Sequence, residues 1–197
     1  MVLLFAGPSG HGKTELARQL GNLISLDLLT IDCTNMHSGF DLWGPVKPYM
    51  GYSDGSKLNN FLAEHSGRRS MVFLDEFEKM GQEIRNTLLL PIQAGKPSPP
   101  TLRRTHLADC NFLSKGICFD LRKELLTLVD CSKTIWIMAT NALDETIHAF
   151  CNSHEKVLFS DEPGQEGQRL VQKLSRSIQK ESVTKFGVRN LLSASQK

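Results

Sequence analysis

The sequence contains no long hydrophobic run, no C-x-x-C pair and almost no excess of charge. No stretch approaches the roughly 18 consecutive apolar residues that a membrane-spanning helix needs. The apolar start, residues 1–7, also lacks the basic region of a signal peptide. The formal net charge of +2 gives no electrostatic basis for binding nucleic acid or an anionic membrane. These absences predict an intracellular, cytoplasmic protein whose partners include neither nucleic acid nor a membrane.

The chain is equally poor in features of a multidomain or disulfide-bonded protein. Its 197 residues are enough for one well-buried domain and too few for two ordinary ones. Five cysteines, an odd number, indicate reduced thiols of the kind found in intracellular proteins. His106, Cys110 and Cys118 share one stretch, but their spacing differs from that of the common zinc frameworks. We therefore favour the absence of a metal site at these three residues.

A glycine-rich motif of the form G-x-x-x-x-G-K-[ST] follows the apolar run at 2–6 and precedes a helical pattern of leucines. Backbone N–H groups of such a loop point at a phosphate, and the helix N-terminus adds its dipole. We expect Lys13 to reach the β- and γ-phosphate oxygens and Thr14 to hold Mg²⁺. The predicted nucleotide-binding residues are Gly7, Pro8, Ser9, Gly10, His11, Gly12, Lys13, Thr14 and Glu15.

Short apolar runs alternate with amphipathic stretches along the rest of the chain. This alternation predicts an α/β protein with a mainly parallel sheet covered by helices on both faces. We predict buried strands at 2–6, 26–33, 71–74 and 133–141, and helices at 13–24, 56–66, 78–95 and 166–182. In the helix at 78–95, Met80, Ile84 and Leu88 align on one face, and Pro91 and Gly95 are expected to mark its end.

Polar residues stand where two later strands are expected to end. Asp75 and Glu76 follow the run "MVFL", and Asn141 closes the run "TIWIMAT". Ligands bind beyond the carboxyl ends of parallel strands, so we expect these residues to meet the glycine-rich loop. Asp75 then fits a second Mg²⁺ ligand, and Glu76 fits the base that deprotonates an attacking water. Asn141 is placed to position the same water or to contact the γ-phosphate.

Three stretches, "GPSGHGKTELARQL", "LDEFEK" and "IWIMATNALD", together resemble AAA+ ATPases of the Clp type, the ring-forming unfoldases and disaggregases. The resemblance covers most of residues 2–95 and 129–145. It implies a three-layer P-loop NTPase fold, ATP and Mg²⁺ as cofactors, a homo-oligomeric ring and a polypeptide substrate. By this resemblance residues 7–14 are Walker A, Asp75 and Glu76 are Walker B, and Asn141 is sensor 1.

Tyr49, in "PYMG", matches the aromatic residue with which this family grips a threaded polypeptide. The family carries a glycine before that aromatic residue, whereas this chain has Pro48. A tyrosine packed on the surface is therefore the alternative interpretation.

The chain also departs from the family. We expect a single ATPase core domain over 1–197, with an atypical insertion at 96–128 and a divergent tail at 183–197. The family's segment before the Walker A strand, its arginine finger, fifth strand and helical lid have no counterpart here, and Arg189 is not assigned as the finger. Without a fifth strand, the strand at 2–6 is expected to form an edge of the sheet.

The favoured function is Mg²⁺-dependent ATP hydrolysis by a module related to protein-unfolding chaperones, with Glu76, Lys13 and Asn141 as the catalytic residues. The departures motivate one alternative, a truncated nucleotide-binding subunit or fragment without turnover of its own. A small-molecule P-loop kinase is a further alternative, but no clear arginine-rich lid supports it.

Overall fold

Four parallel strands form the central sheet of the computed structural model, in the order β1-β6-β3-β2. The strands are β1 (Val2–Ala6), β6 (Thr134–Thr140), β3 (Ser70–Asp75) and β2 (Leu28–Asp32). Among the described residues β1 is an edge strand, as the sequence predicts. The structure describes residues 1–45, 49–50, 54–94, 119–120, 127–158 and 164–186.

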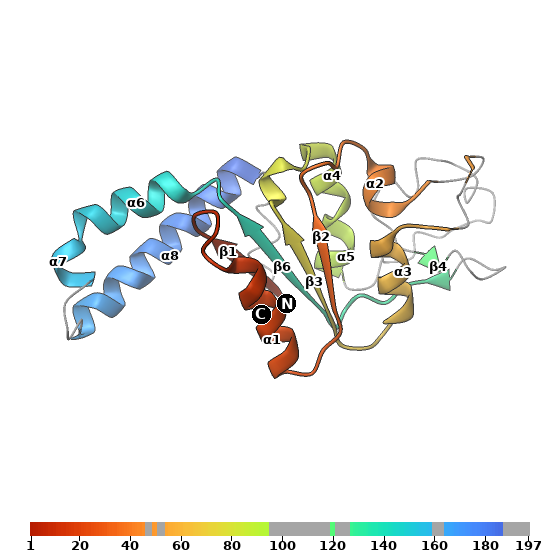
Figure 1. Cartoon of the computed structure of the whole chain (residues 1–197), viewed down its shortest axis with the longest axis horizontal. Helices are drawn as coiled ribbons and strands as arrows, with labels where there is room; N and C mark the ends of the chain where they lie inside the picture. The colour runs from red at the N-terminus through yellow and green to blue at the C-terminus, as the bar shows by residue number, and fades with distance from the viewer. Residues whose placement is uncertain (46–48, 51–53, 95–118, 121–126, 159–163, 187–197) are drawn as a thin grey trace.

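Helices cover the sheet on both faces and produce the three layers of the predicted α/β fold (Figure 1). One face packs on α1 (Lys13–Leu23) through a small cluster that includes Ala17, Phe73 and Ile137. The other face carries the larger core. Its helices are α2 (Gly39–Trp43), α3 (Lys57–Glu64), α4 (Gln82–Thr87) and α5 (Leu89–Ala94).

The central strand β3 is apolar along its length because both of its faces are buried. Met71, Val72, Phe73 and Leu74 are fully buried, and Asp75, the last residue, is half-buried. The carboxylate of Asp75 therefore lies at the carboxyl end of the sheet, where the buried hydrophobic core ends.

Three further helices form an arm that extends away from the sheet (Figure 1). They are α6 (Asp144–Ser153), α7 (Glu155–Leu158) and α8 (Gly164–Phe186). The last turns of α8 return to the sheet, where Phe186 is buried in the larger core. A separate antiparallel pair joins β4 (Phe119–Asp120) to β5 (Thr127–Leu128). In the described part of the chain, no helix combines the length and the apolar character needed to cross a membrane.

The prediction of one continuous helix over 78–95 is wrong. The structure divides this segment into a 3₁₀ turn, η1 (Phe77–Lys79), followed by α4 and α5. Gly81 has an extended backbone and begins α4 anew. Pro91 lies within the first turn of α5 rather than ending a helix, because backbone N–H groups there have no partner within the helix and proline loses nothing.

Other boundaries shift as well. Helix α8 is longer than predicted at both ends and contains the first residues of the expected tail at 183–197. Most of the expected insertion at 96–128, including His106, Cys110 and Cys118, lies outside the described residues.

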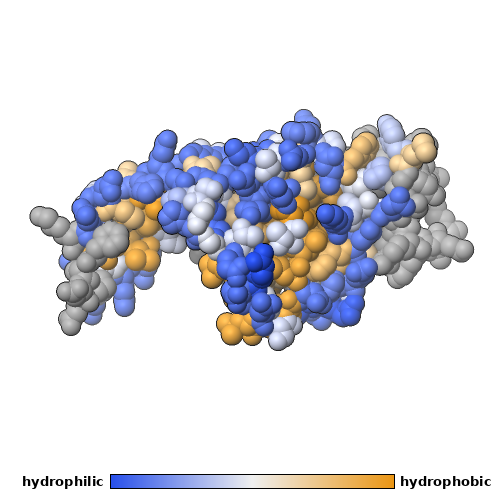
Figure 2. All heavy atoms as spheres, viewed as in Figure 1, coloured by the Kyte–Doolittle hydropathy of each residue, from blue (hydrophilic) through white to orange (hydrophobic). Residues whose placement is uncertain are grey.

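Apolar side chains border α1 on the face seen in Figure 2. Leu16, Leu23 and Ile24 of this region are exposed. Helix α1 and its C-cap therefore present apolar side chains at the surface of the described part of the chain.

Candidate functional site

The glycine-rich loop leaves β1 and curves back over the carboxyl end of the sheet. The N–H of Gly7 donates to the carbonyl oxygen of Thr140 at 3.2 Å, which ties the loop to β6. Gly10 and Gly12 have φ angles of 77° and 75°, in the left-handed region that favours glycine. Gly12 is also the N-cap of α1. These two glycines therefore allow the tight path that joins strand to helix.

The ammonium group of Lys13 lies at the centre of the loop. Its Nζ atom donates to the carbonyl oxygens of Gly7 and Pro8, at 2.7 and 2.8 Å, and to Oδ1 of Asn141 at 2.6 Å. The three donors of the group are thus directed at three acceptors. The cation is held in place by the loop and by the end of β6, the two segments that the sequence predicts to meet.

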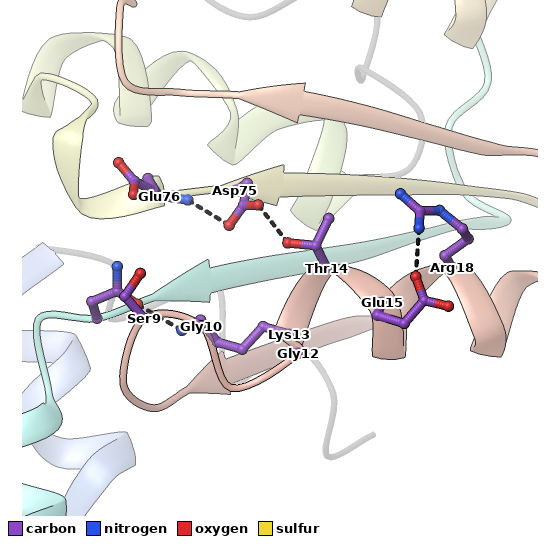
Figure 3. Close-up of a pocket in the computed structure, with 10 residues that line it drawn as sticks. Ser9, Gly10, Gly12, Lys13, Thr14, Glu15, Arg18, Asp75 and Glu76 are labelled. Atoms are coloured by element: carbon purple, nitrogen blue, oxygen red, sulfur yellow. Dashed lines mark hydrogen bonds and ion pairs between the residues drawn. The ribbon is translucent and has the colours of Figure 1, made fainter.

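Thr14 and Asp75 come together on the other side of the loop (Figure 3). The Thr14 hydroxyl donates to Oδ2 of Asp75 at 2.7 Å. Hydroxyl and carboxylate oxygens are the hard ligands that Mg²⁺ prefers. These two side chains line a cavity of about 350 Å³, together with Ser9, Gly10, Gly12, Lys13, Glu15, Arg18, Glu76 and Asn141.

Glu76 occupies an unusual backbone conformation, with φ 50° and ψ 43°. A left-handed conformation costs a non-glycine residue roughly 1–2 kcal/mol, so the surrounding structure must stabilise it. Its N–H donates to Oδ1 of Asp75 at 3.1 Å, and its Oε2 accepts from the hydroxyl of Thr34 at 3.0 Å. The sharp turn separates the two adjacent carboxylates and presents each to a different partner.

Thr34 was not identified from the sequence. It follows β2, whose chain continues past Asp32 so that the N–H of Cys33 donates to the carbonyl oxygen of Asp75 at 3.0 Å. The Thr34 hydroxyl also lies 2.6 Å from Oδ1 of Asp32. Since one hydroxyl carries one proton, Asp32 and Glu76 compete for it. The sequence did offer one signal for Thr34, because it is a polar residue directly after the strand predicted at 26–33.

Glu78 was also not identified. Its Oε1 accepts from the N–H of Asn141 at 3.2 Å, which connects η1 to the end of β6. Its Oε2 is buried and has no hydrogen-bond partner among the described residues. Glu78 thus holds the backbone of Asn141 while the Asn141 side chain contacts Lys13.

Cys33 lies beneath these acidic groups. Burial raises the pKa of its thiol to about 12, with further contributions from the negative charges of Asp32, Asp75, Glu78 and Glu76. The thiol therefore remains neutral and is no nucleophile.

The remaining predicted residues lie at the rim of the cavity or away from it. Glu15 bonds to Arg18 and Gln19, and the hydrogen bond from Gln19 contributes most to the lowered pKa of its carboxyl. His11 is exposed, with Nδ1 3.0 Å from the Ser9 carbonyl oxygen. Arg18, which lines the cavity, was not predicted.

Tyr49 does not line the cavity. It is 54% exposed, and its ring packs on that of Phe40 with the centroids 5.3 Å apart. The neighbouring residues 46–48 and 51–53 lie outside the described residues. Tyr49 is thus available at the surface, as both interpretations of this residue require.

Within the described ranges, no group of three or more histidine, cysteine, aspartate or glutamate side chains could hold a metal ion. A metal ion at the cavity would therefore depend on Thr14 and Asp75 together with oxygen atoms of a ligand.

Comparison with known proteins places the chain in a family. Residues 3–162 match the ATPase family associated with various cellular activities (AAA). The chain is 30% identical over 156 residues to the chaperone protein ClpB of Chlamydia caviae, which covers 76% of this chain and 15% of the relative. It is 34% identical over 96 residues to the ClpA homolog protein of Fuscovulum blasticum, which covers 47% of this chain and 12% of the relative. The chain thus spans only a small part of these curated relatives.

Solved structures of Hsp104 have the same fold. The closed state of Hsp104 with ATPγS and FITC casein gives a TM-score of 0.52 at 24% identity, over 89% of this chain and 25% of that chain. The extended S. cerevisiae Hsp104:casein complex gives 0.50 at 24% identity, with the same coverage. By its family match the chain belongs to the AAA family of ATPases, and over part of their length it is similar to Clp-type chaperones.

Proposed function

We propose that the chain binds ATP with Mg²⁺ and hydrolyses it to ADP and phosphate, as the AAA+ module of a protein-unfolding chaperone. One observation carries the proposal. Three segments far apart in the sequence contribute Lys13 and Thr14, Asp75 and Glu76, and Asn141, and all five residues line one cavity at the carboxyl end of the sheet.

The side chains of this cavity fit a nucleotide and its metal ion. The loop between β1 and α1 supplies backbone N–H groups, and Lys13 supplies a positive charge for phosphate oxygens. Thr14 and Asp75 would hold Mg²⁺, since their oxygen atoms face each other at 2.7 Å. When bound, Mg²⁺ supplies positive charge that offsets the negative charge of the phosphate oxygens.

The chain's own residues accept the proton, orient the reacting groups and bind the phosphate. Glu76 accepts the proton of the attacking water through its carboxylate, which Thr34 holds from one side. Asn141 presents its side-chain amide beside Lys13 and orients the water or the terminal phosphate. Lys13 exchanges its bonds with the Gly7 and Pro8 carbonyl oxygens for bonds with phosphate.

Two variants test the assignment. Lys13→Ala removes the cation, so we expect loss of ATP binding by calorimetry and loss of Mg²⁺-dependent phosphate release. Glu76→Gln keeps a side chain of the same size without the base, so we expect bound ATP and no turnover. Hydrolysis at the wild-type rate by Glu76→Gln would show that another group is the base. ATP binding by the unmodified chain with no phosphate release, even at high protein concentration, would instead favour a nucleotide-binding subunit without turnover.

The proposal extends to a cytoplasmic ring of copies that acts on polypeptides, with Tyr49 as the gripping residue. Its support is the similarity to ClpB chaperones and to Hsp104 structures that contain casein. The exposure of Tyr49 and Phe40 agrees with contact to an extended chain. Tyr49→Ala should weaken binding of fluorescently labelled casein in the presence of ATPγS, whereas Tyr49→Phe should not. Equal loss in both variants would contradict a role for the aromatic ring.

A further inference from the structure

We infer that the last turn of α8 positions two catalytic turns, the one at Glu76 after β3 and the one at Asn141 after β6. Phe186 is the positioning residue for Glu76, and Lys185 is the positioning residue for Asn141. The inference rests on the proposed ATP hydrolysis and adds residues that lie outside the cavity. In Figure 1 the end of α8 lies beside η1 and the carboxyl end of β6.

Phe186 reaches the turn that carries Glu76. Its side chain is only 3% exposed, and its ring meets that of Phe77 edge to face, with centroids 6.0 Å apart and an interplanar angle of 76°. Phe77 directly follows Glu76 and is fully buried. Because Glu76 has a left-handed backbone, packing on the next residue helps to stabilise an otherwise unfavourable turn.

Arg85 of α4 completes this contact. Its guanidinium carbon lies 5.9 Å from the centre of the Phe77 ring and 5.7 Å from that of Phe186. A guanidinium near two aromatic rings is attracted to both of them. One cluster of Phe77, Phe186 and Arg85 thus joins η1, the end of α8 and α4. It begins at the residue that follows Glu76.

Lys185 reaches the other catalytic turn. Its Nζ donates to the carbonyl oxygen of Ala142, the residue after Asn141, at 2.6 Å. The same ammonium lies 3.1 Å from Oε1 of Glu181, whose Oε2 accepts from the hydroxyl of Thr146 at 2.5 Å. The turn after β6 and the first turn of α6 are therefore both attached to α8.

These contacts are concentrated at one end of a long helix. Leu170 and Leu174, earlier in α8, are only half-buried, and Val171 is 58% exposed. The earlier part of the helix belongs to the arm that extends away from the sheet (Figure 1). We therefore expect a shift of that arm to change the positions of Glu76, through Phe186, and of Asn141, through Lys185.

The experiment compares Lys185→Met with Lys185→Arg and with Lys173→Met, an exposed lysine nearer the start of the same helix. Loss of a charged hydrogen bond that orients a catalytic turn should lower kcat for ATP about threefold to tenfold, with KM within about twofold. Lys185→Arg, which keeps a charged donor, should restore kcat. Phe186→Leu, a milder change than truncation, should likewise lower kcat more than it raises KM.

Several results would overturn the inference. The first is an unchanged kcat in Lys185→Met, and the second is an equal fall in Lys173→Met. A third is a fall that disappears once the rate is corrected for the folded fraction by thermal unfolding. Each of these would leave Lys185 with a structural role only.

A second measurement separates this inference from the proposed hydrolysis. The NMR signals of the Asn141 side-chain amide and the Glu76 backbone amide should shift in Lys185→Met and Phe186→Leu, respectively, and stay unchanged in Lys173→Met. If the unmodified chain binds ATP without turnover, these shifts still support the positioning role. Unchanged signals in both variants would contradict it, whatever the activity.

Discussion

The hydroxyl of Thr34 lies 3.0 Å from a carboxylate oxygen of Glu76, although the two residues are forty-two positions apart in the chain. The contact exists because β2 and β3 are adjacent and parallel, with Asp32 paired to Asp75. The residues that follow β2 and those that follow β3 therefore lie at the same end of the sheet. A polar residue after β2 thereby acts on the proposed base after β3.

Thr34→Val should lower kcat for ATP about threefold to tenfold, since the Glu76 carboxylate loses the donor that orients it. The affinity for ATP should change little, because Thr34 does not line the cavity. Steady-state kinetics and calorimetry measure the two quantities. Thr34→Ser keeps the hydroxyl and is the control, so an equal loss in Thr34→Ser would speak against the hydrogen bond as the cause.

Asn141→Ala should lower kcat about tenfold or more while ATP still binds, because the amide near Lys13 contributes mainly to orientation. Asn141→Asp should behave differently. Its carboxylate would pair with the Lys13 ammonium and repel phosphate, so the Kd for ATP should rise. Equal ATP affinity for the two variants would show that residue 141 does not act through Lys13.

Gly12→Ala should destabilise the protein by roughly 1–2 kcal/mol, because residue 12 has a φ of 75° that an alanine adopts at a cost. The space around a Cβ atom is open at Gly12, so the cost comes from the backbone and not from a clash. Urea unfolding measures the change. Gly81→Ala, also at an N-cap and in open space but at an ordinary φ of −59°, is the matched control and should destabilise the protein less than Gly12→Ala.

Thr87→Val should destabilise the fold by about 1–3 kcal/mol. The indole N–H of Trp43 donates to the Thr87 hydroxyl at 2.6 Å, and both residues are buried. Valine has the same shape but accepts no hydrogen bond, so the indole N–H would be left without a partner. Thr87→Ser should retain most of the stability in thermal unfolding. Equal stability of Thr87→Val and the unmodified protein would mean that water replaces the hydroxyl.

Cys33 should make the stability depend on alkaline pH. Its pKa is raised from 9.0 to about 12 in the folded protein, chiefly by burial, so the unfolded chain loses this proton first. Stability is therefore unaffected by the thiol below about pH 9 and falls above it, by up to about 1.4 kcal/mol per pH unit. Urea unfolding between pH 8 and pH 10 measures the slope. Cys33→Ala should remove this part of the fall, and an unchanged slope would assign it to other groups.

Local chemistry explains how much of the cavity was predictable. Residues 7–14 are contiguous, and Gly10 and Gly12 are needed for the conformation of the loop itself, so the motif identifies the loop without reference to the fold. Asp75 and Asn141 follow apolar runs typical of buried strands. Parallel strands release their ends at one edge of a sheet, which is why these residues could be predicted to meet.

The segment after Glu76 shows why the rest could not be predicted. Met80, Ile84 and Leu88 recur at helical spacing, and all three are buried. That pattern does not distinguish one helix from a 3₁₀ turn followed by two short helices. The left-handed turn at Glu76 and the extended Gly81 decide the division, and packing against the rest of the molecule stabilises both.

The strand–loop–helix unit, the acidic pair Asp75 and Glu76, and Asn141 could be predicted because their signals are local in the chain. The order β1-β6-β3-β2 was decided by the tertiary structure, and so were the contacts Thr34–Glu76, Lys185–Ala142 and Phe186–Phe77. The physical reason is that each contact joins segments far apart in the sequence. Burial of both sheet faces brings those segments together, and no single segment carries a signal for its distant partner.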